Sequence, residues 1–121
     1  MIHHISEPTR IVAPGIGEKR IEEFIGHVRT GTGRMSVAHM VATAHWTEPF
    51  QTPAFDEATL VVRGCLRVEY PEGTTDVHAG EVTYVAAGTR IRYSTPGSEE
   101  TEYWAICAPA FHPDTVHRDS A

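Results

Sequence analysis

Residues 50–70, FQTPAFDEATLVVRGCLRVEY, contain the pattern that decides the fold. The run DEATLVV is almost entirely apolar, as in a strand covered on both faces, and CLRVEY alternates as a strand with one buried face does. Gly64 separates the two runs. Glu57 opens the apolar run, although burying a carboxylate is costly or shifts its pKa. The stretch predicts two strands and marks Glu57 as a candidate for metal binding, proton transfer or a structural hydrogen bond.

Further short strands are predicted on both sides of this stretch. RMSVAHMV, TTDVH, two runs within residues 79–97 and TEYWAICAP have strand composition, with Gly and Pro between them. Strands at intervals of about 8 to 12 residues are typical of an all-β sandwich or barrel. We expect a single domain over residues 1–121, with an N-terminal extension over 1–33, a barrel over 34–109 and a C-terminal tail over 110–121.

One short N-terminal helix is predicted in EKRIEEFIGHV, residues 18–28. Ile21, Phe24, Ile25 and Val28 recur at three- and four-residue spacing, which makes one apolar stripe over about three helical turns. The TGTG that follows is expected to end this helix.

The composition is that of an ordinary globular domain, with 121 residues of which 40% are hydrophobic and 21% charged. The formal charge of −6 disfavours a nucleic-acid partner, which requires a basic face. The N-terminus lacks a cationic segment followed by a long apolar run, so no secretory signal or membrane span is expected and the protein is expected to be cytoplasmic. Cys65 and Cys107 are expected to be buried free thiols, with one disulfide as the alternative.

Two segments carry a resemblance to the cupin superfamily. Glu57 and Gly64 match the end of the first cupin motif, E-x6-G, and GEVTYVAAGTRIRYST resembles the second, G-x5-P-x-G-x2-H-x3-N, with Gly80 and Gly88 in register. The resemblance covers about residues 50–95. It implies a double-stranded β-helix, the jelly-roll barrel, which is commonly a homodimer and usually holds a divalent metal through motif histidines and the glutamate.

The chain departs from the cupin motifs at the metal ligands. The two histidines of the first motif are replaced within residues 50–53, FQTP, and the histidine of the second falls on Ile91. Three of the four usual ligands are therefore missing, and an alkyl side chain cannot bind a divalent ion. No cofactor is expected; a divalent metal stays possible but is not supported by the motif residues.

The departures are similar to those of the ethanolamine-utilisation Q (EutQ-type) branch of cupins. That branch has an aromatic-Asp-Glu triplet and the sequence I-x-F-x-T-P where other cupins have histidine. Here the counterparts are FDE at 55–57 and IRYSTP at 91–96. Acetate kinase activity, attributed to the branch, is not carried over, because the chain has no Gly-rich phosphate loop followed by Lys-Ser or Lys-Thr.

Strand alternation places the candidate site residues. If Glu57 points into the barrel, Thr59 does too, and on the second motif strand Ile91 takes the ligand position with Tyr93 on the same face. An interior of this kind is a mostly apolar pocket with a few polar groups, the usual make-up of a small-molecule site. Gln51 lies in the loop before the strand that contains Glu57, at a position where the cupin motif has a metal ligand.

Each candidate has a functional and a structural interpretation. Glu57 is a general acid or base with a pKa raised by burial, or a carboxylate that anchors a tyrosine or loop amides. Tyr93 is a proton donor or a core residue whose hydroxyl is satisfied. Gln51 hydrogen-bonds a substrate carboxylate or amide, or is only a loop residue.

Two further residues are candidates for substrate binding. His39 lies with Val37 and Val41 on the apolar face of its predicted strand and is either a pocket residue or a hydrogen-bonded core histidine. Trp46 precedes a loop near the barrel mouth and is either a stacking platform or packing. Tyr103 and Trp104 alternate on the last strand, and which of them faces inward is left open.

Two functions fit these residues. The first is a small lyase- or isomerase-like enzyme that acts on a small polar metabolite through Glu57 and Tyr93, without an organic cofactor. The alternative is a non-catalytic small-molecule-binding or accessory cupin module. In both cases we expect a small-molecule ligand and a homodimer in which the N-terminal strand or the C-terminal tail crosses over.

Overall fold

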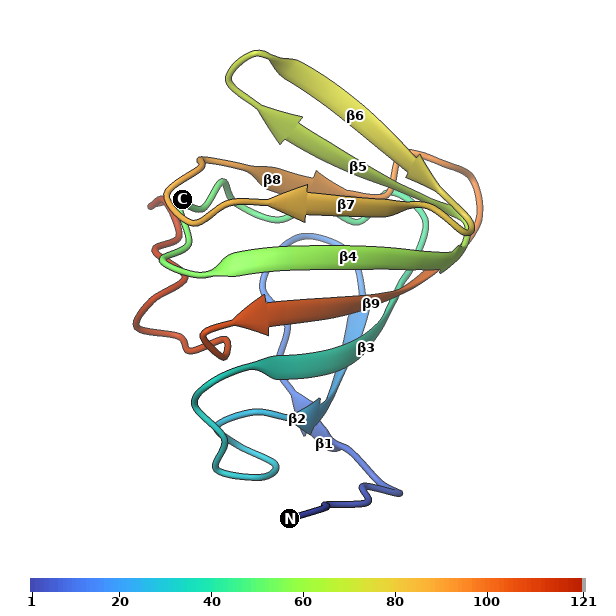
Figure 1. The fold of residues 1–121 in the computed structure, drawn as a ribbon. Coiled ribbons are helices and arrows are strands. Elements are labelled where there is room, and N and C mark those ends of the chain that lie inside the picture. Colours follow the sequence, from blue (N-terminus) through green and yellow to red (C-terminus); the bar gives the residue numbers. More distant parts are fainter. Residues whose placement is uncertain (121) are drawn as a thin grey trace.

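The computed structural model describes residues 1–120 as an all-β protein, and those residues form nine strands and no helix (Figure 1). The strands are β1 (Thr9–Ile11), β2 (Lys19–Ile25), β3 (Ser36–Ala42), β4 (Asp56–Arg63), β5 (Cys65–Tyr70), β6 (Gly73–His78), β7 (Val82–Val85), β8 (Arg92–Ser94) and β9 (Thr101–Ala108). Over this range the chain contains no helix that is long and apolar enough to cross a membrane.

The strands form two antiparallel sheets. The larger sheet has the order β1-β2-β3-β9-β4-β7 and the smaller has the order β6-β5-β8. In Figure 1 the larger sheet curves from β7 down to β1, while β5 and β6 extend above it. This arrangement is the jelly roll that the cupin resemblance implied, and it agrees with the all-β sandwich or barrel that the strand pattern predicted.

The hydrophobic core lies between the two sheets. Leu66 and Val68 of β5 point inward and meet Val61 of β4 and Tyr103 of β9, and each is at most 5% exposed. Full burial of an aliphatic side chain contributes about 1.5–3 kcal/mol. The alternating pattern of CLRVEY thus becomes one inward row that holds the smaller sheet against the larger.

The predicted helix over residues 18–28 is wrong, because Lys19–Ile25 form strand β2. This strand pairs with β1 on one side and with β3 on the other. A β-bulge lies between Glu23 and Ile25, where the register shifts. An extra residue in a strand breaks its two-residue alternation. Here it makes Phe24 and Ile25 adjacent apolar positions, and this spacing imitates that of a helix.

The C-terminal tail folds back on the chain's own 50–54 loop. Its backbone amides and carbonyls pair with those of the loop, as in the hydrogen bond from Ala54 N–H to Thr115 O at 2.8 Å. Val116 is buried beside Phe55, and Phe111 packs against both. The tail therefore closes one end of this chain, and the homodimer stays a prediction.

The cysteines are both free. Cys107 is buried, as expected, whereas Cys65 is only half-buried. No disulfide joins the two sheets at these positions.

Candidate functional site

A cavity of about 70 Å³ lies against the inner face of the larger sheet. One water needs roughly 10–15 Å³, so the cavity has room for several water-sized groups. Strands β2, β3, β4 and β9 line it from the sheet, and the N-terminal segment, the 48–51 loop and the C-terminal tail line the rest. Its polar and titratable side chains include Lys19, Glu23, Ser36, Glu48, Gln51, Glu57, Tyr93, Tyr103, Cys107 and Arg118.

Glu57 lines this cavity from strand β4, as its position in the sequence predicted. The Tyr93 hydroxyl donates a hydrogen bond to its Oε1 at 2.8 Å, and the Cys107 thiol lies 3.7 Å from its Oε2. Burial raises the pKa of Glu57, and the hydrogen bond from Tyr93 and the charge of Lys19 oppose that rise. The result is a carboxyl group whose proton affinity is higher than that of a solvated glutamate.

Tyr93 and Cys107 keep their own protons. Burial, together with the neighbouring Glu57 charge, raises the pKa of Tyr93 well above its ordinary value. The same two causes, burial first, raise the pKa of the Cys107 thiol. Both groups therefore act as hydrogen-bond donors to Glu57 at neutral pH and orient its carboxylate.

The other predicted residues divide between the cavity and the core. Gln51 is 6% exposed and lines the cavity, and its backbone pairs with Ile91 through N–H···O bonds of 2.9 and 2.8 Å. Thr59 and Ile91 are each 1% exposed and are not among the residues that line the cavity. Trp46 is equally buried and donates its indole N–H to the Pro14 carbonyl at 3.3 Å. These last three are packing residues behind the site.

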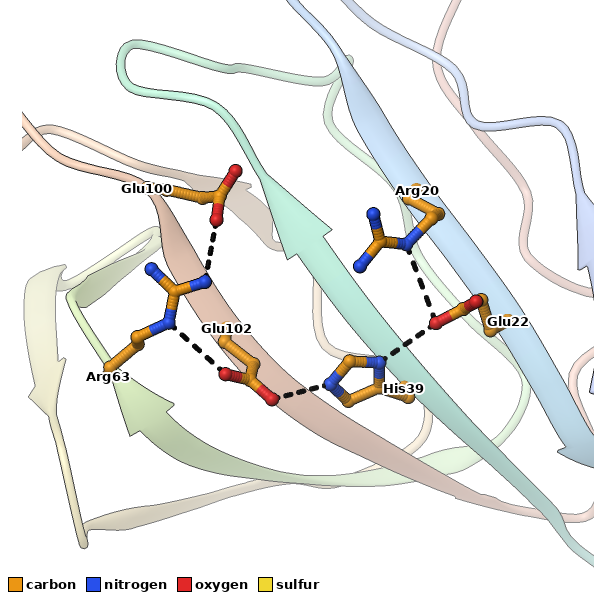
Figure 2. Close-up of polar contacts among 6 residues, drawn as sticks. All are labelled: Arg20, Glu22, His39, Arg63, Glu100 and Glu102. Atoms are coloured by element: carbon orange, nitrogen blue, oxygen red, sulfur yellow. Dashed lines mark hydrogen bonds and ion pairs between the residues drawn. The ribbon is translucent and has the colours of Figure 1, made fainter.

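His39 does not enter the cavity, so its predicted place there is wrong. It lies on the outer face of the larger sheet, where Nδ1 is 3.0 Å from Glu22 Oε1 and Nε2 is 2.7 Å from Glu102 Oε2 (Figure 2). The alternation on β3 runs the other way, with Ser36 and Ala38 lining the cavity. Sequence reasoning chose the wrong face because the outer face of β3 is also apolar.

The last strand resolves the open choice between its two aromatic residues. Tyr103 is 3% exposed and lines the cavity, whereas Trp104 lies on the outer face with its ring centroid 4.8 Å from that of His39. Each β9 residue shares a face with its partner on β3, and Tyr103 pairs with Met40 while Trp104 pairs with His39.

Sequence reasoning missed Glu48. Its side chain lines the cavity, the residue is 7% exposed, and its Oε2 is buried without a hydrogen-bond partner among residues 1–120. Burial raises the pKa of Glu48 to about 7, and the charge of Lys19 limits the rise. The only hint in the sequence is an acidic residue between Trp46 and Pro49, next to the first motif.

Lys19 and Arg118 were also missed. The Lys19 ammonium lies 4.0 Å from the centroid of the Trp46 ring and 5.1 Å from that of Tyr103. Burial lowers the pKa of Lys19, and it lowers that of Arg118 as well. The sequence predicts a helix at Lys19 and a terminal tail at Arg118, and it relates neither residue to Glu57.

The donor set of the cavity does not fit the divalent metal that cupin motifs usually hold. No cluster of three or more His, Cys, Asp or Glu side chains suited to a metal ion occurs within residues 1–120. Ile91 is an alkyl group in the core, and both oxygens of Glu57 already face donors of the protein. The cavity itself supplies acidic, basic and hydroxyl side chains that can take part in chemistry.

Comparisons with known proteins identify the fold. No family model matches the chain. Solved structures do: the EutQ protein of Clostridium difficile has a TM-score of 0.66 at 18% identity, covering 78% of this chain and 65% of that one. The polyketide cyclase RemF of Streptomyces resistomycificus has a TM-score of 0.76 at 14% identity, covering 100% of this chain and 87% of that one. The chain has the cupin fold. At these identities the likeness shows the cupin fold alone, with EutQ among its structural neighbours.

One curated protein is similar in sequence. The endoribonuclease YbeY of Myxococcus xanthus is 42% identical over 102 residues, which are 84% of this chain and 35% of that protein. The matched segment thus spans about a third of the length of that relative. The activity named for the whole relative does not extend from such a segment to this chain.

Proposed function

We propose that this cupin-fold chain is a small enzyme of the lyase or isomerase type that acts on a small polar metabolite in the cavity, with Glu57 as the acid–base group. The observation that carries the proposal is the Glu57 carboxylate in the cavity wall, held by the Tyr93 hydroxyl at 2.8 Å. Acid–base chemistry is most efficient when the pKa of the catalytic group lies near the operating pH, and burial moves the pKa of Glu57 in that direction.

The proposed chemistry uses the protein's own groups. An ionised Glu57 removes a proton from the bound metabolite, and the protonated carboxyl returns it to another atom or to a leaving group. Tyr93 stays protonated, so its hydrogen bond stabilises the ionised carboxylate and fixes its orientation.

A non-catalytic binding module is the second candidate. It is favoured by the partners of Glu57, because Tyr93 engages one carboxylate oxygen and Cys107 lies beside the other. A carboxylate held in this way also serves as a structural anchor. In that case the cavity holds a metabolite without changing it.

RNA is not the proposed substrate, although the curated relative is named an endoribonuclease. The formal charge of −6 opposes the approach of a phosphate backbone, which depends on cationic contacts. A cavity of about 70 Å³ is also small for a nucleotide chain. We therefore propose a cytoplasmic enzyme with a small-molecule ligand and no nucleic-acid or membrane partner.

A homodimer is part of the proposal. Large apolar side chains are exposed on the outer side of β4 and β7, including Leu60 at 39%, Val82 at 62% and Tyr84 at 65%. These residues lie opposite one another across the two strands, Leu60 with Val82 and Ala58 with Tyr84. A second copy of the chain placed on this face would remove them from water.

The test compares the wild type with Glu57→Gln in a mixture of small metabolites extracted from cells. Mass spectrometry is expected to find at least one metabolite that the wild type consumes or forms and that Glu57→Gln does not. Glu72→Gln is the control, because Glu72 is exposed on the turn between β5 and β6. Identical metabolite profiles for all three proteins would contradict the proposed enzymatic function. A metabolite that stays bound through desalting would then establish the binding module.

A further inference from the structure

Two cations in the cavity wall lack an anionic partner. Neither Lys19 nor Arg118 takes part in an ion pair within residues 1–120, although both line the cavity. The contacts of Lys19 are instead with the faces of Trp46 and Tyr103, which favour the charged ammonium. Lys19 is half-buried and Arg118 is exposed. Their unpaired charges at this cavity can receive an anionic group of a ligand, Lys19 as the more sheltered of the two.

One acceptor in the same cavity also lacks a partner. Glu48 Oε2 is buried and receives no hydrogen bond from residues 1–120, while the rest of its side chain is almost wholly enclosed. Buried polar atoms in proteins are nearly always hydrogen-bonded, so an exception of this kind needs an explanation. Glu48 and Lys19 affect each other's pKa but are not in ion-pair contact, so neither satisfies the other.

Glu57 differs from Glu48 in this respect. Its two oxygens already face the Tyr93 hydroxyl and the Cys107 thiol. The charged groups of the cavity without a protein partner of their own within residues 1–120 are therefore the two cations and the Oε2 atom of Glu48. A ligand complementary to these groups has an anionic acceptor at one position and an N–H or O–H donor at another.

We infer that the cavity binds a small carboxylic acid that also carries a hydroxyl or ammonium group, with its carboxylate against Lys19 and Arg118 and its donor against Glu48. The cavity volume of about 70 Å³ limits the enclosed part to a few non-hydrogen atoms. The inference rests on the proposed function, because it names the ligand class of the same cavity.

Four three-carbon probes separate the two recognition elements. Lactate and alanine carry both a carboxylate and a donor, propionate carries the carboxylate only, and 1,2-propanediol carries donors only. Isothermal titration of the full chain at pH 7 is expected to show lactate or alanine binding about ten- to a hundredfold more tightly than propionate and propanediol. The relative affinities of lactate and alanine show whether the cavity prefers a hydroxyl or an ammonium group as the donor.

Two variants assign each preference to its residue. Lys19→Met is expected to abolish the advantage of lactate or alanine over propanediol, and Glu48→Met the advantage over propionate. Arg20→Met and Glu72→Met are matched controls: Arg20 is on the outer face of β2, Glu72 is on an exposed turn, and the charge changes are the same. If Glu48→Met does not fold, Glu48→Gln keeps the shape and is expected to lose the preference for alanine.

The results separate this inference from the proposed function. Absence of binding by every probe, equal binding of all four, or a preference that survives both variants would overturn the ligand class. If a neutral metabolite is turned over in a reaction that depends on Glu57, the proposed enzymatic function is supported and the inferred ligand class is contradicted. Selective binding of lactate or alanine without any reaction that depends on Glu57 would keep the ligand class and overturn the catalytic role.

Discussion

The two faces of the larger sheet differ in how their charged side chains are paired. On the outer face, Figure 2 shows a row of six titratable side chains in which basic and acidic groups alternate. From one end to the other these are Arg20, Glu22, His39, Glu102, Arg63 and Glu100, joined by contacts of 3.5, 3.0, 2.7, 3.2 and 2.6 Å. At the inner face, Glu57 and Lys19 of the sheet share a cavity with Glu48 of the 48–51 loop. No ion pair joins these three residues among residues 1–120.

The pKa values of the glutamates follow this difference. The hydrogen bond with His39 lowers the pKa of Glu22 and that of Glu102 on the outer face. Burial raises the pKa of Glu48 and that of Glu57 on the inner face. Pairing with a cation favours the carboxylate, whereas removal from water favours the acid. The comparison teaches that one sheet provides a stabilising charge network on one side and reactive, incompletely satisfied groups on the other.

The largest expected effect is that of Glu57→Gln on function. Loss of the titratable group is expected to reduce turnover by about 10²- to 10⁴-fold or to abolish it. The melting temperature is expected to stay nearly unchanged or to rise, because functional sites often hold groups that are poor for stability. Thermal melts at neutral pH check this without knowledge of the substrate. A loss of roughly 1–3 kcal/mol in unfolding free energy would instead make Glu57 a structural anchor.

The second prediction concerns Glu48 and pH. Its folded pKa of about 7 lies above the ordinary value of 4.5, so the folded state keeps a proton that the unfolded state releases. The stability this provides is fully present below pH 4.5 and is lost as the pH rises through 7. The loss is on the order of 3 kcal/mol. Glu48→Gln is expected to remove this loss. In urea unfolding, the free energy of unfolding of the variant should therefore rise relative to that of the wild type between about pH 5 and pH 8. An equal response of both proteins to pH would place Glu48 in contact with water.

The third prediction tests the core behind the cavity. Ile91 is 1% exposed and packs in the main cluster, so Ile91→His is expected to retain the fold and to lower the unfolding free energy by about 1–3 kcal/mol for an unpaired buried ring. Ile91→Val is the control, with an expected loss of about 0.5–1.5 kcal/mol. A histidine variant that cannot fold would show that this position tolerates no polar group.

A smaller effect is expected from breaking the outer network with His39→Gln. Although burial lowers the pKa of His39, the hydrogen bonds with Glu22 and Glu102 raise it above 6.5 overall. The contribution of the histidine is fully present below pH 6.5 and is lost as the pH rises through its folded pKa. The contribution of the two glutamates is present above pH 4.5. The variant should therefore lose about 1 kcal/mol near pH 5.5 and much less at about pH 9 in urea unfolding. A loss that does not depend on pH would assign the effect to packing against Trp104.

The smallest expected effect is that of a chelator. Incubation with EDTA is expected to leave the melting temperature unchanged, and elemental analysis is expected to find no stoichiometric divalent metal. The reason is the donor set, in which Ile91 and Gln51 stand at positions of the usual ligands. About one metal per chain, lost in Glu57→Gln, would contradict this and would indicate a site built from residues outside the motifs.

Local patterns were sufficient for most of the fold. The alternation of CLRVEY, the apolar run after Glu57 and the glycines between strands predicted an all-β sandwich or barrel, because side chains of a strand point to opposite faces in turn. The resemblance to the cupin motifs narrowed this prediction to the jelly roll. The positions of Glu57 and Tyr93 in one cavity followed from the same rule applied to the two motif strands. The rule failed at β2, where the bulge between Glu23 and Ile25 imitates helical spacing.

The rest of the site depends on contacts between distant segments. The face that His39 takes was decided by β3 pairing with β2 and β9, because apolar residues occupy both sides of β3 and local alternation cannot choose between them. Lys19, Glu48 and Arg118 come from a strand, a loop and a terminal tail, and no spacing along the chain relates them. The sequence by itself determined an all-β barrel with a carboxylate on an inner strand. Only the tertiary structure decided which charges surround that carboxylate, because burial and pairing are properties of the folded neighbourhood and not of the local chain.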